Sequence, residues 1–223
     1  MGDEANRVVV WNLTTKNIEG RLSGGDSRYA MRDVAFVPNS SFVAGVSTDG
    51  AVRMWDVRNL AQSGLDAPPP GFTLFKGTVP LDSIDVSKDG RWLATVDENR
   101  EIRVYDVGSR SEALTIKGPP FVLGNVAFSP DASLLAVAGG DGAVYVWSRS
   151  DGQLRAVLPQ HANAVNSVRF TPDSGELVTA SGDGTAAISE CRRCGVFDDV
   201  LLEAETRVAA RGLLAANPTR SSG

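Results

Sequence analysis

The feature that most constrains this chain is an internal repeat. One block recurs four times in register, at residues 33–57, 83–107, 125–149 and 167–191, and a fragment of a fifth copy stands at 7–13. An aromatic residue near the end of the block falls at Trp11, Trp55, Tyr105 and Trp147, and Ser189 takes its place in the last copy. The intervals between these positions are 44, 50, 42 and 42 residues. Such a period predicts one supersecondary unit per repeat, stacked on its neighbours.

Each block predicts three short strands joined by tight turns. A turn such as Ser129-Pro130-Asp131 follows the first strand, and an Asp-Gly pair separates the second strand from the third in three of the four blocks. Asn99-Arg100 stands at the Asp-Gly position in the second block, where we expect a looser turn because Arg adopts a positive φ only at some cost. A fourth strand is expected in the linkers, at 72–76, 113–117 and 153–158. Four antiparallel strands per repeat are the blades of a β-propeller.

The count of strands predicts an all-β, incomplete propeller of about four and a half four-stranded blades. Residues 1–190 hold the last two strands of one blade, three complete blades and one blade that lacks its last strand. Residues 191–223 hold a CxxC pair and a short C-terminal helix at about 197–216, with a disordered end. We therefore expect unpaired sheet faces at the ends, and a chain that is the C-terminal remainder of a longer product or a truncated copy.

The composition is that of a soluble globular protein, with 42% hydrophobic and 22% charged residues. A net charge of −5 gives no basic surface for nucleic acid, so DNA or RNA is not expected as a partner. The longest apolar runs are far shorter than a membrane span needs, and the acidic start lacks a basic signal region. The composition predicts a cytoplasmic protein without membrane contact.

The blocks FSPDASLLAVAGGDGAVYVW and VRFTPDSGELVTASGDGT resemble WD repeats over about residues 7–190. The resemblance implies a non-enzymatic interaction platform without cofactor, whose protein or ligand partner is unknown. It assigns structural roles to Trp55, Tyr105 and Trp147. It also implies a hydrogen-bonded chain of His161, Thr179 or Ser181, and Asp183 in the last repeat. Because no repeat carries the family's complete set of residues, the resemblance implies marginal blades.

The segment 191–211 resembles the ending of actinobacterial multidomain proteins, in which a WD-repeat propeller follows a STAND-class NTPase or a transcriptional activator module. This likeness implies a sensor or regulatory part of a bacterial signal-transduction protein, with upstream blades and a fused NTPase or regulatory module as its partners. The chain itself contains no GxxxxGK[ST] phosphate loop.

Cys191 and Cys194 are the sharpest chemical feature of the sequence. Two intervening residues favour half of a metal site over a structural disulfide. A complete zinc site needs four ligands, so it would require a second chain or an exogenous ligand. Packed or surface thiols are the favoured interpretation. A metal-bridged assembly and a redox pair remain the alternatives.

Position and residue type suggest a partner-binding surface at the segments that precede the inner strands. The candidates are Tyr29, Arg32, Phe121, Asn163 and Asn166. A propeller hydrolase is the competing class, for which only Asp33, Asp85 and Asn125 on inner strands could serve. The triple proline at 68–70 is more simply a stiff exposed loop than a polyproline recognition segment.

Overall fold

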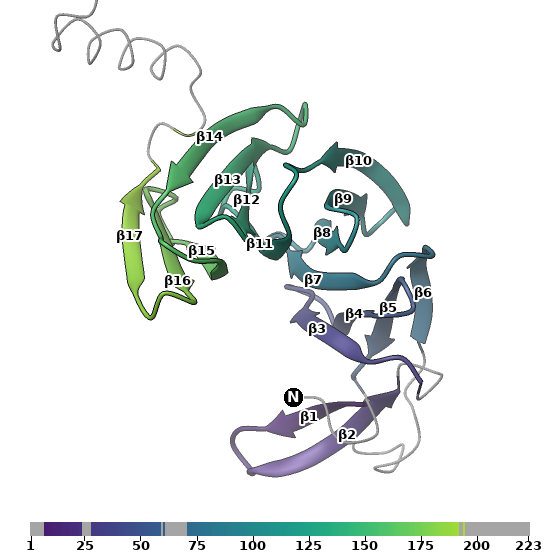
Figure 1. Cartoon of the computed structure of the whole chain (residues 1–223). Coiled ribbons are helices and arrows are strands. Elements are labelled where there is room, and N and C mark those ends of the chain that lie inside the picture. The colour runs from purple at the N-terminus through teal and green to yellow at the C-terminus, as the bar shows by residue number, and fades with distance from the viewer. Residues whose placement is uncertain (1–6, 24–27, 59, 61–70, 192–193, 195–223) are drawn as a thin grey trace, which may run out of the picture.

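A computed structural model describes residues 7–23, 28–58, 60, 71–191 and 194. Its strands form five antiparallel sheets that follow one another along an open arc (Figure 1), and these sheets are called blades 1 to 5 in chain order. The prediction of an incomplete all-β propeller is confirmed. The triple proline and the expected C-terminal helix lie outside the described residues.

Two strands form blade 1, four strands form each of blades 2, 3 and 4, and three strands form blade 5. Blade 1 contains β1 (Arg7–Asn12) and β2 (Asn17–Ser23). Blade 2 contains β3 (Met31–Phe36), β4 (Phe42–Ser47), β5 (Ala51–Asp56) and β6 (Gly71–Lys76). Blade 3 contains β7 (Leu81–Val86), β8 (Trp92–Asp97), β9 (Glu101–Asp106) and β10 (Ser111–Lys117). Blade 4 contains β11 (Leu123–Phe128), β12 (Leu134–Gly139), β13 (Ala143–Ser148) and β14 (Leu154–Pro159), and blade 5 contains β15 (Val165–Phe170), β16 (Glu176–Ser181) and β17 (Ala186–Glu190).

The turn between the second and third strands of a blade depends on a residue with positive φ. Gly142 occupies it in blade 4 with φ 88°, and a Cβ there would meet the His161 carbonyl oxygen at 2.2 Å. Arg100 occupies the same place in blade 3 with φ 67°. The expected looser turn is wrong, because Arg100 N–H donates to Asp97 O over 2.9 Å, no longer than the equivalent bond of Gly142 at 3.3 Å.

The core consists of layers between neighbouring blades. Three of these layers each contain one large aromatic side chain. Trp55 packs with Val8 and Leu22 of blade 1, and its indole N–H donates to Ser23 O over 3.2 Å. Tyr105 packs against blade 2, and Trp147 packs against Ile102 and Val104 of blade 3. Trp55, Tyr105 and Trp147 are therefore the wedges between blades, whereas Trp11, at the same position of the fragmentary first copy, is 54% exposed.

Exposed apolar side chains lie on blade 5 and on β3, the inner strand of blade 2, which follows the two-stranded blade 1. On β3, Val34 and Phe36 are exposed, and on blade 5 Val178 and Ile188 are exposed. In the described residues, no helix has the length and apolarity that a membrane crossing requires.

Candidate functional site

One face of the arc carries the connections that lead from the outer strand of each blade to the inner strand of the next. We call it the connection face. Each connection accepts a backbone hydrogen bond from the turn between the second and third strands of the blade that follows. The donors are Thr48, Glu98, Gly140 and Gly182, and the acceptors are the carbonyl oxygens of Ala30, Pro80, Val122 and Ala164, in the same order, over 2.8–3.1 Å. The face is therefore a row of loops with fixed backbones, which is the usual setting of binding residues on a rigid scaffold.

The five partner-binding candidates lie in three of these connections or at the start of the strand that follows them, where Arg32 belongs to β3 and Asn166 to β15. Tyr29 and Arg32 lie at the start of blade 2, Phe121 lies before blade 4, and Asn163 and Asn166 lie at the start of blade 5. Tyr29 is 39% exposed and Phe121 is 44% exposed.

The polar candidates differ in how much of their bonding capacity is already used. Arg32 Nε lies 3.9 Å from Asp82 Oδ1, where burial raises the pKa of Asp82 although Arg32 lowers it. Asn163 Oδ1 accepts the Ala164 N–H over 2.7 Å and shapes its own loop. Asn166 is exposed.

Val122 is a member of this surface that the sequence reasoning missed. It is 75% exposed beside Phe121, and its carbonyl oxygen accepts the Gly140 N–H over 2.8 Å. The signal in the sequence is an aliphatic residue between an aromatic one and the first buried residue of β11.

His161, the single histidine of the sequence, is held on both sides of its ring. Its Nε2 lies 2.8 Å from Thr179 Oγ1, and its Nδ1 lies 3.1 Å from Asp183 Oδ2 and 3.0 Å from Thr185 Oγ1. The structure thus brings together three residues that the WD-repeat resemblance implies. Hydrogen bonds, first from Thr185, hold the pKa of Asp183 well below its usual range although burial acts against them. Ser181 instead donates to the Asn163 and Ala164 carbonyls.

The other blades are tied differently, which the sequence reasoning missed. In blade 2, Asp49 accepts from Arg53 Nη2 over 2.5 Å and from Lys76 Nζ over 2.6 Å. Burial alone raises the pKa of Asp49, but the hydrogen bonds from Arg53 and Lys76 outweigh it and the pKa is lowered. We expected marginal blades because the family's residues are missing. That expectation did not consider that Arg53 and Lys76 could bind Asp49 in their place.

Blades 3 and 4 use the same position of the third strand. Arg103 Nη1 donates to the buried Asp97 over 2.8 Å in blade 3. In blade 4 the Tyr145 hydroxyl donates to Asp141 over 2.6 Å, and burial, together with Asp141, raises the pKa of Tyr145 to about 12. A polar side chain two residues before each anchoring aromatic was the available signal.

The three residues considered for a hydrolase connect inner strands to the next blade. Asp33 Oδ2 accepts from the Ser83 hydroxyl and the Ile84 N–H, each over 3.0 Å. Asp85 Oδ2 accepts the Phe128 N–H over 2.8 Å, and burial raises the pKa of Asp85. Asn125 Oδ1 accepts the Val168 N–H over 3.2 Å. Each of these three polar side chains therefore forms hydrogen bonds that join its blade to the next one.

The preference for free thiols at Cys191 and Cys194 is wrong, because the two sulfurs form a disulfide. The Cys194 N–H donates to Cys191 O over 3.0 Å, and this turn brings the Cα atoms to 5.0 Å, within the range that a disulfide needs. Both cysteines are buried in the layer between blades 4 and 5, where Ser189 replaces the anchoring aromatic. Sulfurs bonded to each other cannot serve as the thiolate ligands of a metal bridge.

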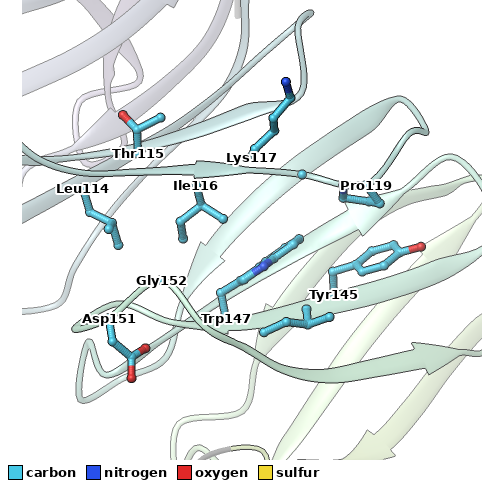
Figure 2. Close-up of a pocket in the computed structure, with 11 residues that line it drawn as sticks. Leu114, Thr115, Ile116, Lys117, Pro119, Tyr145, Trp147, Asp151 and Gly152 are labelled. Atoms are coloured by element: carbon cyan, nitrogen blue, oxygen red, sulfur yellow. The ribbon is translucent and has the colours of Figure 1, made fainter.

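A cleft of about 450 Å³ opens between β10 and blade 4. In Figure 2, Leu114 and Ile116 of β10 point toward the Trp147 ring, whereas Lys117 points away. The Tyr145 and Trp147 rings are stacked with centroids 5.7 Å apart. The cleft continues the apolar layer between blades 3 and 4 to the outer surface.

Comparison with known proteins identifies the repeat. The family model "WD domain, G-beta repeat" matches residues 18–56, 72–106, 113–148 and 152–188. Each matched segment contains the outer strand of one blade and the first three strands of the next, so consecutive repeats interlock.

Relatives come from plants, animals and bacteria. Transcriptional corepressor LEUNIG_HOMOLOG of Arabidopsis thaliana is 38% identical over 72% of this chain and 19% of its own length. WD repeat-containing protein 1 of Gallus gallus is 30% identical over 60% of the chain and 21% of its own length. An uncharacterized WD repeat-containing protein of Synechocystis is 27% identical over 58% of the chain and 35% of its own length. The chain thus spans between a fifth and about a third of these relatives.

The family matches account for well over half of the chain, and they coincide with the observed strands. Proteins built from these repeats are generally non-enzymatic scaffolds for protein interactions. The chain belongs to the WD domain, G-beta repeat family.

Proposed function

We propose that this chain binds a protein partner through its connection face and catalyses no reaction. The observation that carries the proposal is the exposure of Tyr29, Phe121 and Val122 on loops whose backbones are fixed by hydrogen bonds. Aromatic side chains on a rigid surface supply large contact area at low entropic cost, and such residues dominate the binding energy of protein interfaces.

The finer proposal is that the chain serves as the sensor or regulatory part of a larger bacterial signal-transduction protein in the cytoplasm. Its support is the resemblance of residues 191–211 to the ending of actinobacterial proteins that join a propeller to an NTPase or activator module. The Synechocystis relative adds a bacterial case of the same repeats. In this proposal, upstream blades cover the unpaired sheet faces at the ends of the arc, and the fused module is the natural partner of the connection face.

The test compares three immobilised forms of the chain in lysate of the source organism, with quantitative mass spectrometry of the bound proteins. One is the natural chain, and one carries Tyr29→Ser, Phe121→Ser and Val122→Ser. The matched control carries Trp11→Ser and Leu13→Ser, which remove exposed apolar groups at the turn between β1 and β2, away from the connection face.

The proposal expects at least one protein to be retained by the natural chain and the control and lost from the triple variant. Loss of more than about 90% of that protein corresponds to at least 1.4 kcal/mol of binding free energy. Identical sets of bound proteins for all three forms would contradict the proposal.

A further inference from the structure

A second hollow lies on the side of the arc opposite the connection face. It has a volume of about 310 Å³ and is lined by residues at the ends of β7, β11 and β15, the inner strands of blades 3, 4 and 5. Three consecutive blades therefore contribute to one concave site, within the size range of small-ligand pockets. None of its lining residues belongs to the protein-binding surface proposed above.

The rim of this hollow is built from one turn that repeats in the three blades. In each turn a Ser or Thr hydroxyl donates to the carboxylate of the Asp two residues later, over 2.5–2.6 Å. The same hydroxyl oxygen accepts a backbone N–H at the start of the next strand. The pairs are Ser87 with Asp89, Ser129 with Asp131, and Thr171 with Asp173. Because these bonds close each turn on itself, the site is preorganised before a ligand arrives.

The wall of the hollow is apolar. Val86 and Phe128 are buried at the ends of β7 and β11, and Phe170 is partly buried at the end of β15. Such a wall favours an aliphatic or aromatic group of a ligand over water.

Two cationic side chains face this wall. Arg169 Nη1 donates to Asn125 Oδ1 and to Val168 O, the latter over 2.8 Å, which fixes the plane of the guanidinium. Within the described part of the chain, Nε and Nη2 of Arg169 donate to no protein atom, and Lys88 is exposed at the other side of the hollow. A guanidinium held in this way presents a fork that matches a carboxylate.

Asp85 is the one anion in the lining, and its Oδ2 is occupied by the Phe128 N–H. Lys88 and Arg169 outnumber Asp85 among the lining side chains, and the rim aspartates Asp89, Asp131 and Asp173 accept hydrogen bonds within their own turns. We propose that this hollow binds a carboxylate carried on an apolar group. Two sources offer this chemistry, the free C-terminus of a peptide with a hydrophobic last residue and a free hydrophobic acid.

The test is titration calorimetry of the full chain with three probes. These are a short acetylated peptide that ends in phenylalanine with a free carboxylate, the same peptide as its C-terminal amide, and 3-phenylpropionate. The free carboxylate should bind at least about tenfold more tightly than the amide, because a hydrogen-bonded ion pair is lost. Binding of 3-phenylpropionate without binding of the peptide assigns the site to free hydrophobic acids.

Variants locate the binding within the chain. Lys88→Met should weaken carboxylate binding about tenfold, whereas Lys117→Met, which removes another exposed charge on β10, should leave it unchanged. Asp85→Asn should tighten binding, because it removes the opposing charge. Equal affinity for acid and amide, equal effects of the two lysine variants, or no binding of any probe at about 10 mM would overturn the proposal.

Discussion

Blades 4 and 5 follow the same repeat block, but their third strands differ in sequence and their surroundings differ. Every residue of β12 and β13 in blade 4 is buried, because blade 3 covers one face and blade 5 covers the other. In β17 of blade 5, exposed and partly buried residues alternate, and Ile188 is 68% exposed. A blade therefore buries its apolar surface only where a neighbouring blade covers it, whatever the pattern of its own repeat provides.

The largest effect should come from the layer that blade 4 shares with blade 3. Trp147→Ala should lower the free energy of unfolding by about 3–5 kcal/mol, because it empties a site where the indole is 96% buried. Urea unfolding followed by circular dichroism measures it, with the exposed Trp11→Ala as control. An unchanged midpoint for Trp147→Ala would show that this residue is not a wedge between blades.

The layer between blades 4 and 5 depends on the disulfide in place of an aromatic. Reduction of Cys191–Cys194, or replacement of both residues by Ser, should lower the free energy of unfolding by at most about 2 kcal/mol, because the closed loop is short. Thermal melts with and without reductant measure this change. A loss of stability as large as that caused by Trp147→Ala would show that the disulfide stabilises its layer as strongly as the aromatic side chain does.

The polar ties of the interior blades should contribute less and depend on pH. Asp49→Asn should cost about 1 kcal/mol at pH 7, because it weakens the bonds from Arg53 and Lys76. The folded-state pKa of Asp49 is lowered, so the contribution is complete above the unfolded pKa of about 4 and is lost as the pH falls through the folded value.

Urea midpoints of the natural chain and Asp49→Asn should therefore converge in acid. If the two midpoints differ by the same amount at pH 7 and pH 3, the charge of Asp49 does not contribute to stability.

The smallest effect on stability should come from the open face of blade 5. Ile188→Ser should change the free energy of unfolding by less than about 0.5 kcal/mol, because the side chain is mostly in water. The same change should reduce self-association, since exposed apolar patches such as Val178 with Ile188 promote contact between copies. Light scattering over a range of concentrations compares the two forms. Equal self-association would show that this face of blade 5 is not a contact between copies.

Most of the fold follows from local sequence signals. The Asp-Gly turns, the alternating strands and the aromatic positions at Trp55, Tyr105 and Trp147 act within one blade or its direct neighbour, so the period alone predicts them. The bonds of Arg53 and Tyr145 were missed although both residues stand two positions before an anchoring aromatic, because the sequence position does not show which side chain each one meets across the turn.

The candidate surface was predicted in part. Position before the inner strands was enough to find Tyr29 and Phe121, because every connection lies on the same face. Val122 escaped because aliphatic residues are usually assigned to the core, and its exposure depends on the way the Val122 carbonyl binds Gly140. The disulfide escaped because a two-residue spacer permits it only in the turn that Cys194 makes with Cys191.

Native-state hydrogen exchange tests the dependence of each blade on its neighbours most directly. Amides of β12 and β13, enclosed between two blades, should exchange only through global unfolding, whereas amides of β16 and β17 should exchange through local opening and be at least about a hundredfold less protected. Equal protection of blade 4 and blade 5 would contradict the claim that neighbouring blades determine the stability of each repeat.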